Sequence, residues 1–203
     1  MTRRINQAGL WHIQSWEGCK LTAYKDIAGV WTIGYGSTGK HVKPGMKISP
    51  EEAEDLLRRD LDRFEKRVET LVKVPLSDNQ FAALVSFDFN TGALHKSTLL
   101  KKLNAGDYKA VPSELMKWVK AKVNGKLTTV KGLQNRRASE AEMWKTTKVS
   151  QPAPQPIPSK PVVVHVDPDG SVKPGSSPVK TVERNPWWLA LFAILKAIFR
   201  RGK

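Results

Sequence analysis

The spacing of apolar residues predicts a mainly helical chain with a short β-structure near its beginning. Apolar side chains recur on one helical face between residues 5 and 17, and Gly18 then predicts the end of that helix. Residues 30–35 alternate large side chains with Thr or Gly, and a short apolar segment at 21–26 precedes them. This alternation predicts a β-hairpin directly after the first helix.

The segment that follows reads as a series of helices. They are predicted over residues 49–74, 77–91, 97–104, 108–118 and 132–144. The first of them has a typical start, with Ser49 as N-cap, Pro50 in the first helical position and Glu52 three residues after the cap. Pro112 fits its helix only in the first turn, because a proline further inside would remove a backbone hydrogen bond.

A change of composition near residue 150 separates a tail from the helical region. Closely spaced prolines at 151–158 predict an extended spacer, so we interpret residues 149–184 as a flexible linker after a domain at 1–148. Residues 185–203 form a predicted helix that is apolar almost all round. Its apolar part is about 22 Å long, which is too short for an ordinary membrane span.

This C-terminal helix has the features of a segment that lies at a membrane surface. Tryptophans at one end and arginines at the other are typical anchors at the boundary between lipid and water. The expected membrane-binding residues are Trp187, Trp188, Leu191, Phe192, Leu195, Phe199, Arg200 and Arg201. Docking of the helix onto the preceding domain, or self-association, is the alternative, although a proline-rich tether suits a docked helix poorly.

The formal net charge of +15 predicts a polyanionic partner. The first 150 residues contain no recognised nucleic-acid-binding motif and no basic run, so we expect no nucleic acid. Peptidoglycan, teichoic acid, anionic phospholipid and lipopolysaccharide are the other candidates. The single cysteine, Cys19, and the lack of Cys/His metal spacing predict no internal disulfide, no metal and no cofactor. No apolar run of signal-peptide length follows the first arginines, so we expect no signal peptide or signal-anchor.

Two carboxylates flank the start of the predicted hairpin. Glu17 closes the first helix next to Trp16, whereas Asp26 lies in a polar turn beside Lys25. Glycoside hydrolysis needs one protonated carboxyl group as the acid and one ionised carboxylate. Burial against the apolar helix face favours a protonated Glu17, which we assign the acid role, and Asp26 is expected to be ionised. The spacing alone leaves open that both are surface charges at a helix end and a turn.

The same stretch resembles the phage-type lysozymes, the endolysins of glycoside hydrolase family 24. The hallmark of that family is a Glu-Gly at a helix end, an Asp nine residues after the Glu, and a Thr six residues after the Asp in a glycine-rich hairpin. Glu17, Gly18, Asp26 and Thr32 match these spacings, and residues 32–36 read Thr-Ile-Gly-Tyr-Gly. Two further segments, at residues 80–92 and 132–144, resemble the other signatures of the family.

The resemblance covers about residues 5–146 and carries several implications. It implies an α+β, lysozyme-like fold, mainly helical, with a small N-terminal antiparallel sheet lobe, to which the extended tail and C-terminal helix are added. It implies a muramidase that hydrolyses the β-1,4 bond between N-acetylmuramic acid and N-acetylglucosamine in peptidoglycan. Glu17, Asp26 and Thr32 would be its catalytic residues, and the carboxylate separation that decides between inversion and retention stays open.

The resemblance also implies roles for residues outside the hairpin. Phe89, Asn90 and Thr98 match positions that contact the sugar, but Phe89 is equally well explained as a core residue and Asn90 as part of a helix cap. Arg136 and Arg137 are expected to form ion pairs with glutamates of their helix or with acids of the catalytic lobe, rather than to meet carboxylates of the peptide stems.

For the whole chain, the resemblance implies synthesis in the host cytoplasm and release to the wall through a membrane lesion. We also expect a monomer. One alternative is a membrane-disrupting protein that acts mainly through the C-terminal helix. Another is a lytic transglycosylase, which uses one glutamate and no water, but the presence of both Asp26 and Thr32 favours hydrolysis.

Overall fold

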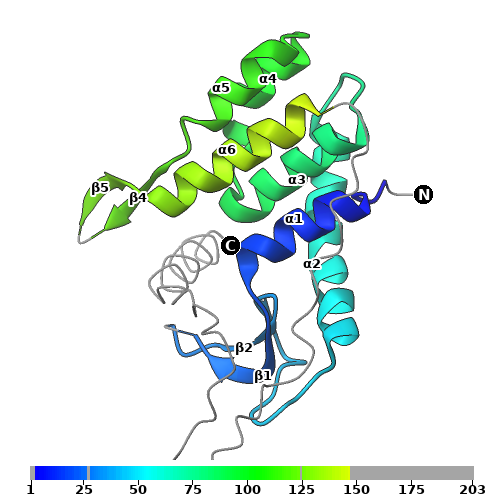
Figure 1. Cartoon of the computed structure of the whole chain (residues 1–203), viewed down its shortest axis with the longest axis vertical. Coiled ribbons are helices and arrows are strands. Elements are labelled where there is room, and N and C mark those ends of the chain that lie inside the picture. The colour runs from blue at the N-terminus through cyan, green and yellow to red at the C-terminus, as the bar shows by residue number, and fades with distance from the viewer. Residues whose placement is uncertain (1–2, 27, 124, 147–203) are drawn as a thin grey trace, which may run out of the picture.

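The computed structural model describes residues 3–26, 28–123 and 125–146, which form a mainly helical α+β fold with a small sheet (Figure 1). Its α-helices are α1 (Gln7–Glu17), α2 (Pro50–Leu71), α3 (Asp78–Thr91), α4 (Thr98–Asn104), α5 (Val111–Leu115) and α6 (Lys131–Lys145). Two short 3₁₀ helices are η1 (Leu94–Lys96) and η2 (Tyr108–Ala110). The strands are β1 (Lys20–Lys25), β2 (Trp31–Gly34), β3 (Ser37–Thr38), β4 (Lys120–Val123) and β5 (Lys126–Thr129). The predicted fold class is confirmed.

Strands β1, β2 and β3 form an antiparallel sheet directly after α1, as the alternation predicted. Gly18 ends α1 with a φ of 65°, which only glycine adopts readily, and the chain turns into β1. The alternating side chains of β2 do not divide into one buried and one exposed face, because Thr32 and Ile33 are both buried. A small core of Ile33, Val42, Ile48 and Ala53 fills the space between the sheet and α2.

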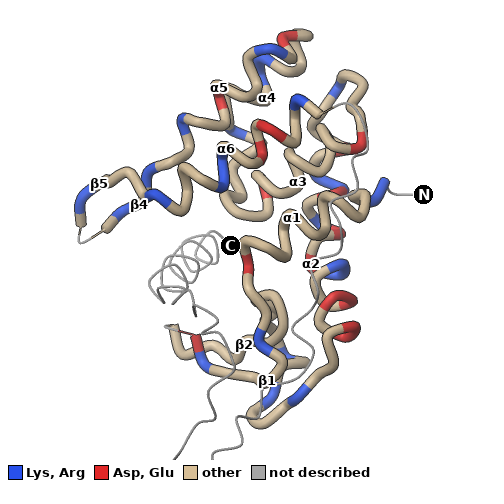
Figure 2. The backbone as a smooth tube through the Cα atoms, in the orientation of Figure 1, with Lys and Arg blue, Asp and Glu red and all other residues tan. Residues whose placement is uncertain are grey.

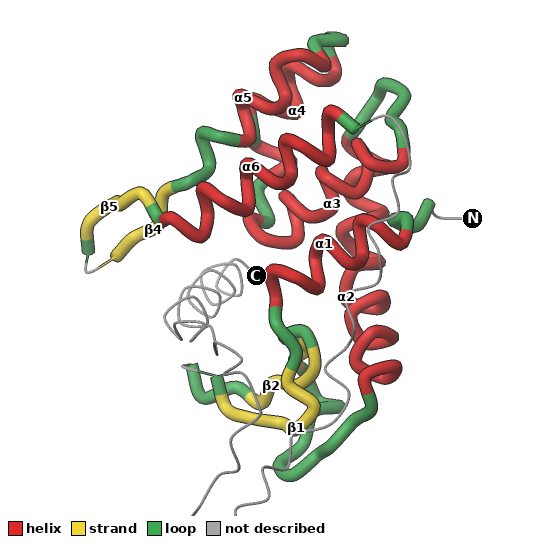
Figure 3. The backbone as a smooth tube through the Cα atoms, viewed as in Figure 1, coloured by secondary structure: helices red, strands yellow, loops and turns green. Residues whose placement is uncertain are grey.

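Helix α2 connects the sheet to the other helices (Figure 3). Its start is the predicted one: the Ser49 side chain accepts from the Glu52 backbone, and the Glu52 carboxylate accepts from the Ser49 backbone. The helix packs against β2 near this start and against α3 further along. Since one continuous helix belongs to both cores, it sets the position of the sheet relative to the helical lobe.

The larger core is built around α3, in which every residue from Phe81 to Asn90 is buried. Helices α1, α2 and α6 pack on α3 from different sides. The approach of α1 is close at Gly9, where an added Cβ would lie 2.4 Å from the Cβ of Ala82. Glycine at this position therefore lets the two helices touch, and it fixes the direction in which α1 delivers its last residue.

The prediction of one helix over residues 108–118 is wrong. The chain forms η2 and then the five-residue α5, with Pro112 in the first turn as expected. It leaves the helical path after Leu115 and enters the antiparallel pair β4–β5, which the sequence analysis did not predict. Lysine-rich strands with few apolar residues give a weak alternation signal, which explains the omission.

The tail lies outside the described residues. This applies to the linker at 149–184 and to the helix at 185–203 with its expected membrane-binding residues. Among the residues that are described, none of the helices combines the length and apolarity needed to cross a bilayer.

Candidate active site

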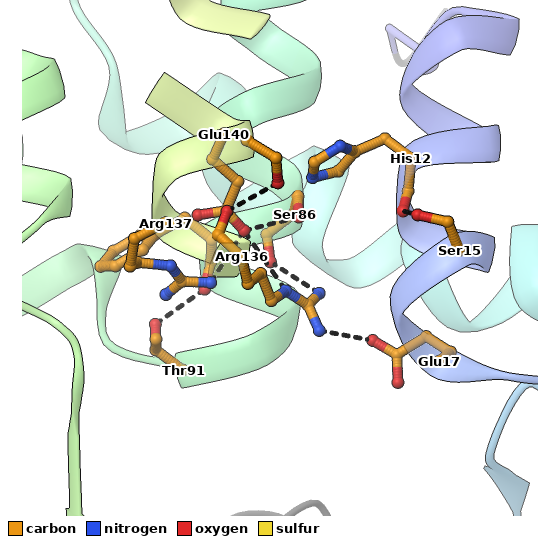
Figure 4. Close-up of polar contacts among 10 residues, drawn as sticks. His12, Ser15, Glu17, Ser86, Thr91, Arg136, Arg137 and Glu140 are labelled. Carbon is orange, nitrogen blue, oxygen red and sulfur yellow. Dashed lines mark hydrogen bonds and ion pairs between the residues drawn. The ribbon is translucent and has the colours of Figure 1, made fainter. Parts of the chain in front are cut away.

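Glu17 lies at the C-terminal end of α1 and is 6% exposed. Its Oε1 accepts a hydrogen bond from Arg136 Nη1 at 2.9 Å, in an ion pair that joins α1 to α6 (Figure 4). The predicted burial of Glu17 is therefore present, but its surroundings are not simply apolar. Burial disfavours the ionised carboxylate, whereas the guanidinium favours it, so two opposing influences meet at this side chain.

Arg136 is itself shared between two carboxylates. Its Nε donates to Glu140 Oε1 at 3.4 Å, and its Nη2 lies 3.5 Å from the carbonyl oxygen of Ser86. Glu140 Oε1 also accepts from Ser86 Oγ at 2.7 Å and from Arg137 Nη2 at 2.8 Å. The expected ion pairs of both arginines are confirmed, and they fix the guanidinium that contacts Glu17.

The cluster holds further buried groups. Burial, followed by the charges of Arg136 and Arg137, lowers the pKa of His12 to about 3, so this histidine is neutral. Its Nε2 is buried without a hydrogen-bond partner among the described residues. Burial also lowers the pKa of Arg137 to about 10, although Glu140 opposes the shift, and the guanidinium lies over the Phe87 ring. Glu140 is one of the helix glutamates that were expected to pair with the arginines, whereas no pattern in the sequence predicts the neutral His12, because residues far apart in the chain create its environment.

Asp26 and Thr32 are brought together through Val30. Asp26 Oδ1 accepts from the backbone N–H of Ala28 at 2.9 Å and of Val30 at 2.8 Å. The Thr32 hydroxyl donates to the Val30 carbonyl at 3.0 Å, and the side chain is 4% exposed. One tight turn therefore positions both side chains of the predicted pair.

Tyr24 links this turn to Glu17. Burial raises the pKa of Tyr24, and the negative charges of Asp26 and then Glu17 raise it further. Tyr24 pairs with Thr32 in the sheet register, so it lies beside one of the three predicted catalytic residues and within reach of the charges of the other two. No motif pointed to Tyr24, although its place between Glu17 and Thr32 in the sequence was a usable signal. By contrast, burial raises the pKa of the neighbouring Cys19 thiol, which disfavours a reactive thiolate.

The three residues that resemble sugar contacts lie in different surroundings. Phe89 is 7% exposed and packs edge-to-face on Phe64 at 5.2 Å, which favours its interpretation as a core residue. Asn90 is buried near the end of α3, and its Oδ1 has no hydrogen-bond partner among the described residues. Thr98 is exposed at the start of α4, where its hydroxyl donates to Glu114 at 2.6 Å.

A helix-end carboxylate next to a small sheet that carries a second carboxylate and a hydroxyl, in a mainly helical α+β fold, defines a lysozyme-like glycosidase. The comparisons with known proteins agree. Residues 14–140 match the phage lysozyme family. The chain belongs to this family, and it is a peptidoglycan-hydrolysing endolysin of the muramidase type.

Individual relatives resemble most of the domain. An endolysin of Acyrthosiphon pisum secondary endosymbiont phage 1 is 46% identical over 144 residues, which is 70% of this chain and 98% of the relative. An endolysin of Bacillus phage B103 is 42% identical, and the match spans 77% of this chain but only 60% of that relative. The structure of an endolysin from Escherichia coli O157:H7 phage FAHEc1 superimposes with a TM-score of 0.67 at 38% identity, covering 73% of this chain and 97% of the other.

Proposed function

We propose that Glu17 is the general acid that protonates the glycosidic oxygen between N-acetylmuramic acid and N-acetylglucosamine. The observation that carries the assignment is the buried position of Glu17 at the end of α1, directly before the strands whose turn holds Asp26 and Thr32. Arg136 holds the Glu17 carboxylate in place, and because Glu140 also binds Arg136, the positive charge is not devoted to Glu17 alone.

Asp26 and Thr32 are assigned to the attacking water. Backbone N–H groups hold Asp26 Oδ1, so Oδ2 is the oxygen that we assign to the water. The Thr32 hydroxyl donates to Val30, and its oxygen is left to accept a hydrogen bond from the same water. In this arrangement the bond to the leaving sugar breaks as Glu17 gives up its proton, and the water adds to the anomeric carbon while its proton passes to Asp26.

Asn90 is proposed to bind substrate. Its buried Oδ1 lacks a partner in the described part of the chain, and a buried acceptor of this kind is stabilised when a donor reaches it. If the Asn90 side chain turns towards the groove, a hydroxyl or N-acetyl group of the sugar would supply that donor. Phe89 and Thr98 receive no such role, because Phe89 packs in the core and the hydroxyl of Thr98 is bound to Glu114.

The substitution Glu17→Gln tests the acid. It keeps the shape of the side chain and removes the proton, so we expect at least about a hundredfold loss in the rate at which purified peptidoglycan is cleared. The matched control is Glu142→Gln, which neutralises an exposed carboxylate on α6 and should leave the rate unchanged. Circular dichroism and thermal unfolding check that both variants are folded.

The products decide between the candidate reactions. Hydrolysis gives fragments with reducing-end muramic acid, which mass analysis identifies. Anhydro-muramic products would assign the chain to the lytic transglycosylases instead. A folded Glu17→Gln variant that clears peptidoglycan at the wild-type rate would contradict the assignment of the acid.

For the tail we propose, from the sequence, that residues 185–203 bind an anionic membrane or lipopolysaccharide, in a monomeric protein made in the host cytoplasm. Aromatic and basic residues at opposite ends of an apolar segment support the assignment. Replacing Trp187 and Trp188 with alanine in the full chain should weaken binding to anionic vesicles and leave clearing of purified peptidoglycan intact. Equal vesicle binding by this variant would argue against the proposal and against membrane disruption by the tail.

A further inference from the structure

The antiparallel pair β4–β5, here called the basic hairpin (Lys120–Val123 and Lys126–Thr129), projects from the helical lobe just before α6 (Figure 1). Its base is attached to the domain. Ala121 is 8% exposed, and the Val130 N–H donates to the Val119 carbonyl at 2.8 Å. Beyond this attachment, every other described residue of the two strands is exposed.

The charge around the basic hairpin is of one sign. Residues 115–139 contain no Asp or Glu, whereas Lys117, Lys120, Lys122, Lys126 and Lys131 fall within them. Figure 2 shows basic residues along both strands. Lys117 is paired with Glu114, but in the described part of the chain the other four lysines form no ion pair. Their charge is therefore available to a partner.

Exposed apolar side chains lie among these lysines. The described residues contain four exposed large hydrophobic side chains, and three of them are Met116 at 40%, Val123 at 38% and Leu127 at 71%. The register places Lys122 directly opposite Leu127, so both lie on the same face of the hairpin, and Val123 opposite Lys126 on the other face. Each face therefore combines a lysine with an apolar side chain.

Protection of the strand edges explains only part of this pattern. Lysines on a short exposed ribbon prevent pairing with other strands, and this role needs no apolar residue. A soluble sugar polymer or a nucleic acid would use the lysines but would leave Leu127 in water. A phospholipid surface, with phosphates outside and hydrocarbon beneath them, can bind both the lysines and the apolar side chains.

We propose that the basic hairpin is a membrane-binding element for an anionic phospholipid surface. Lys120, Lys122 and Lys126 contact the headgroup phosphates, while Leu127 and Val123 enter the layer just below them. This surface lies within the described domain and is separate from the C-terminal segment. The proposal does not depend on the assignment of the catalytic residues, because the basic hairpin carries none of them.

Vesicle partitioning of the full-length chain tests the proposal. The vesicles contain phosphatidylethanolamine and phosphatidylglycerol, with phosphatidylcholine vesicles as the neutral reference. The double substitution Lys122→Gln and Lys126→Gln is expected to weaken partitioning about thirtyfold, because each lysine near an anionic surface contributes about a fivefold factor. Leu127→Ser is expected to weaken it about tenfold through the loss of apolar burial. The remaining binding of the double variant should depend less steeply on salt than that of the parent.

The matched control is Lys40→Gln with Lys43→Gln, which removes the same charge from two exposed positions between β3 and α2. We expect this control to weaken partitioning less than about threefold, which reflects net charge alone. All variants should clear purified peptidoglycan at the parent rate, so a failure of the catalytic assignment would be seen separately.

Three results would overturn the proposal. Equal losses in the two double-lysine variants would show that only net charge matters. Unchanged partitioning of Leu127→Ser would exclude entry of the hairpin into the lipid layer. Loss of binding to insoluble peptidoglycan, with vesicle binding intact, would assign the basic hairpin to the wall polymer instead.

Discussion

The partly buried His12 of α1 predicts how the stability of the domain depends on pH. Burial, and then the charges of Arg136 and Arg137, lower the pKa of His12 to about 3, from an ordinary value of 6.5. Between these two values the unfolded chain binds a proton at this residue and the folded protein does not. Stability therefore falls as the pH falls from 6.5 towards 3, and it is unaffected by His12 above that range.

The size of the effect follows from proton linkage. One proton bound only by the unfolded state changes the free energy of unfolding by about 1.4 kcal/mol per pH unit. Acidification from pH 6.5 to pH 4.5 should therefore remove about 2.3 kcal/mol through His12 alone, towards a limit of about 5 kcal/mol below pH 3. A loss of this size is a large part of the stability of an ordinary domain.

The substitution His12→Phe isolates this contribution. Phenylalanine keeps an aromatic ring next to Trp16, which the histidine contacts edge-on at 6.3 Å, and it does not titrate. Urea unfolding at a series of pH values from 7 to 4 gives the slope of the free energy for parent and variant. Carboxylates that titrate in the same range are present in both proteins, so the difference between the slopes reports His12.

The expected result is a variant whose stability declines less steeply on acidification, by about 1.4 kcal/mol per pH unit below pH 6. Parallel slopes for parent and His12→Phe would refute the conclusion that His12 is held neutral in the folded protein.

Two further predictions concern packing and a second ionised group. Gly9→Ala should lower the free energy of unfolding by about 1–3 kcal/mol, because the new Cβ meets Ala82. The control Gly132→Ala, whose Cβ would have nothing within 4 Å, should not lower it. Urea unfolding compares the two variants. The hydrogen bond from Lys102, together with weaker contributions from other hydrogen bonds, lowers the pKa of Glu114 to about 2. The stability that Glu114 adds to the fold is therefore complete above pH 4.5 and is lost as the pH falls towards 2. For Glu114→Gln, the free energy of unfolding should decline less steeply between pH 4.5 and pH 2. An unchanged decline would show that Glu114 does not stabilise the fold in this way.

Local signals in the sequence were enough for most of the elements. Helix α2 begins at its capping box, α3 ends at Gly92 in the left-handed conformation, and α1 ends at Gly18, because each signal acts within one turn of the helix. The spacing of Glu17, Asp26 and Thr32 is equally local, since one helix end and one hairpin contain all three. The family and its reaction could therefore be inferred from a short stretch of chain.

What the tertiary structure alone decided is non-local. Arg136 reaches Glu17 across 119 positions of the chain, and Glu140 and Ser86 hold it there from two different helices. The splitting of residues 108–118 into η2 and α5 also depends on packing, because the local pattern there favoured a single helix. Periodicity and capping describe interactions between neighbours in sequence, whereas the charge surrounding a buried carboxylate is set by whichever helices the core brings together.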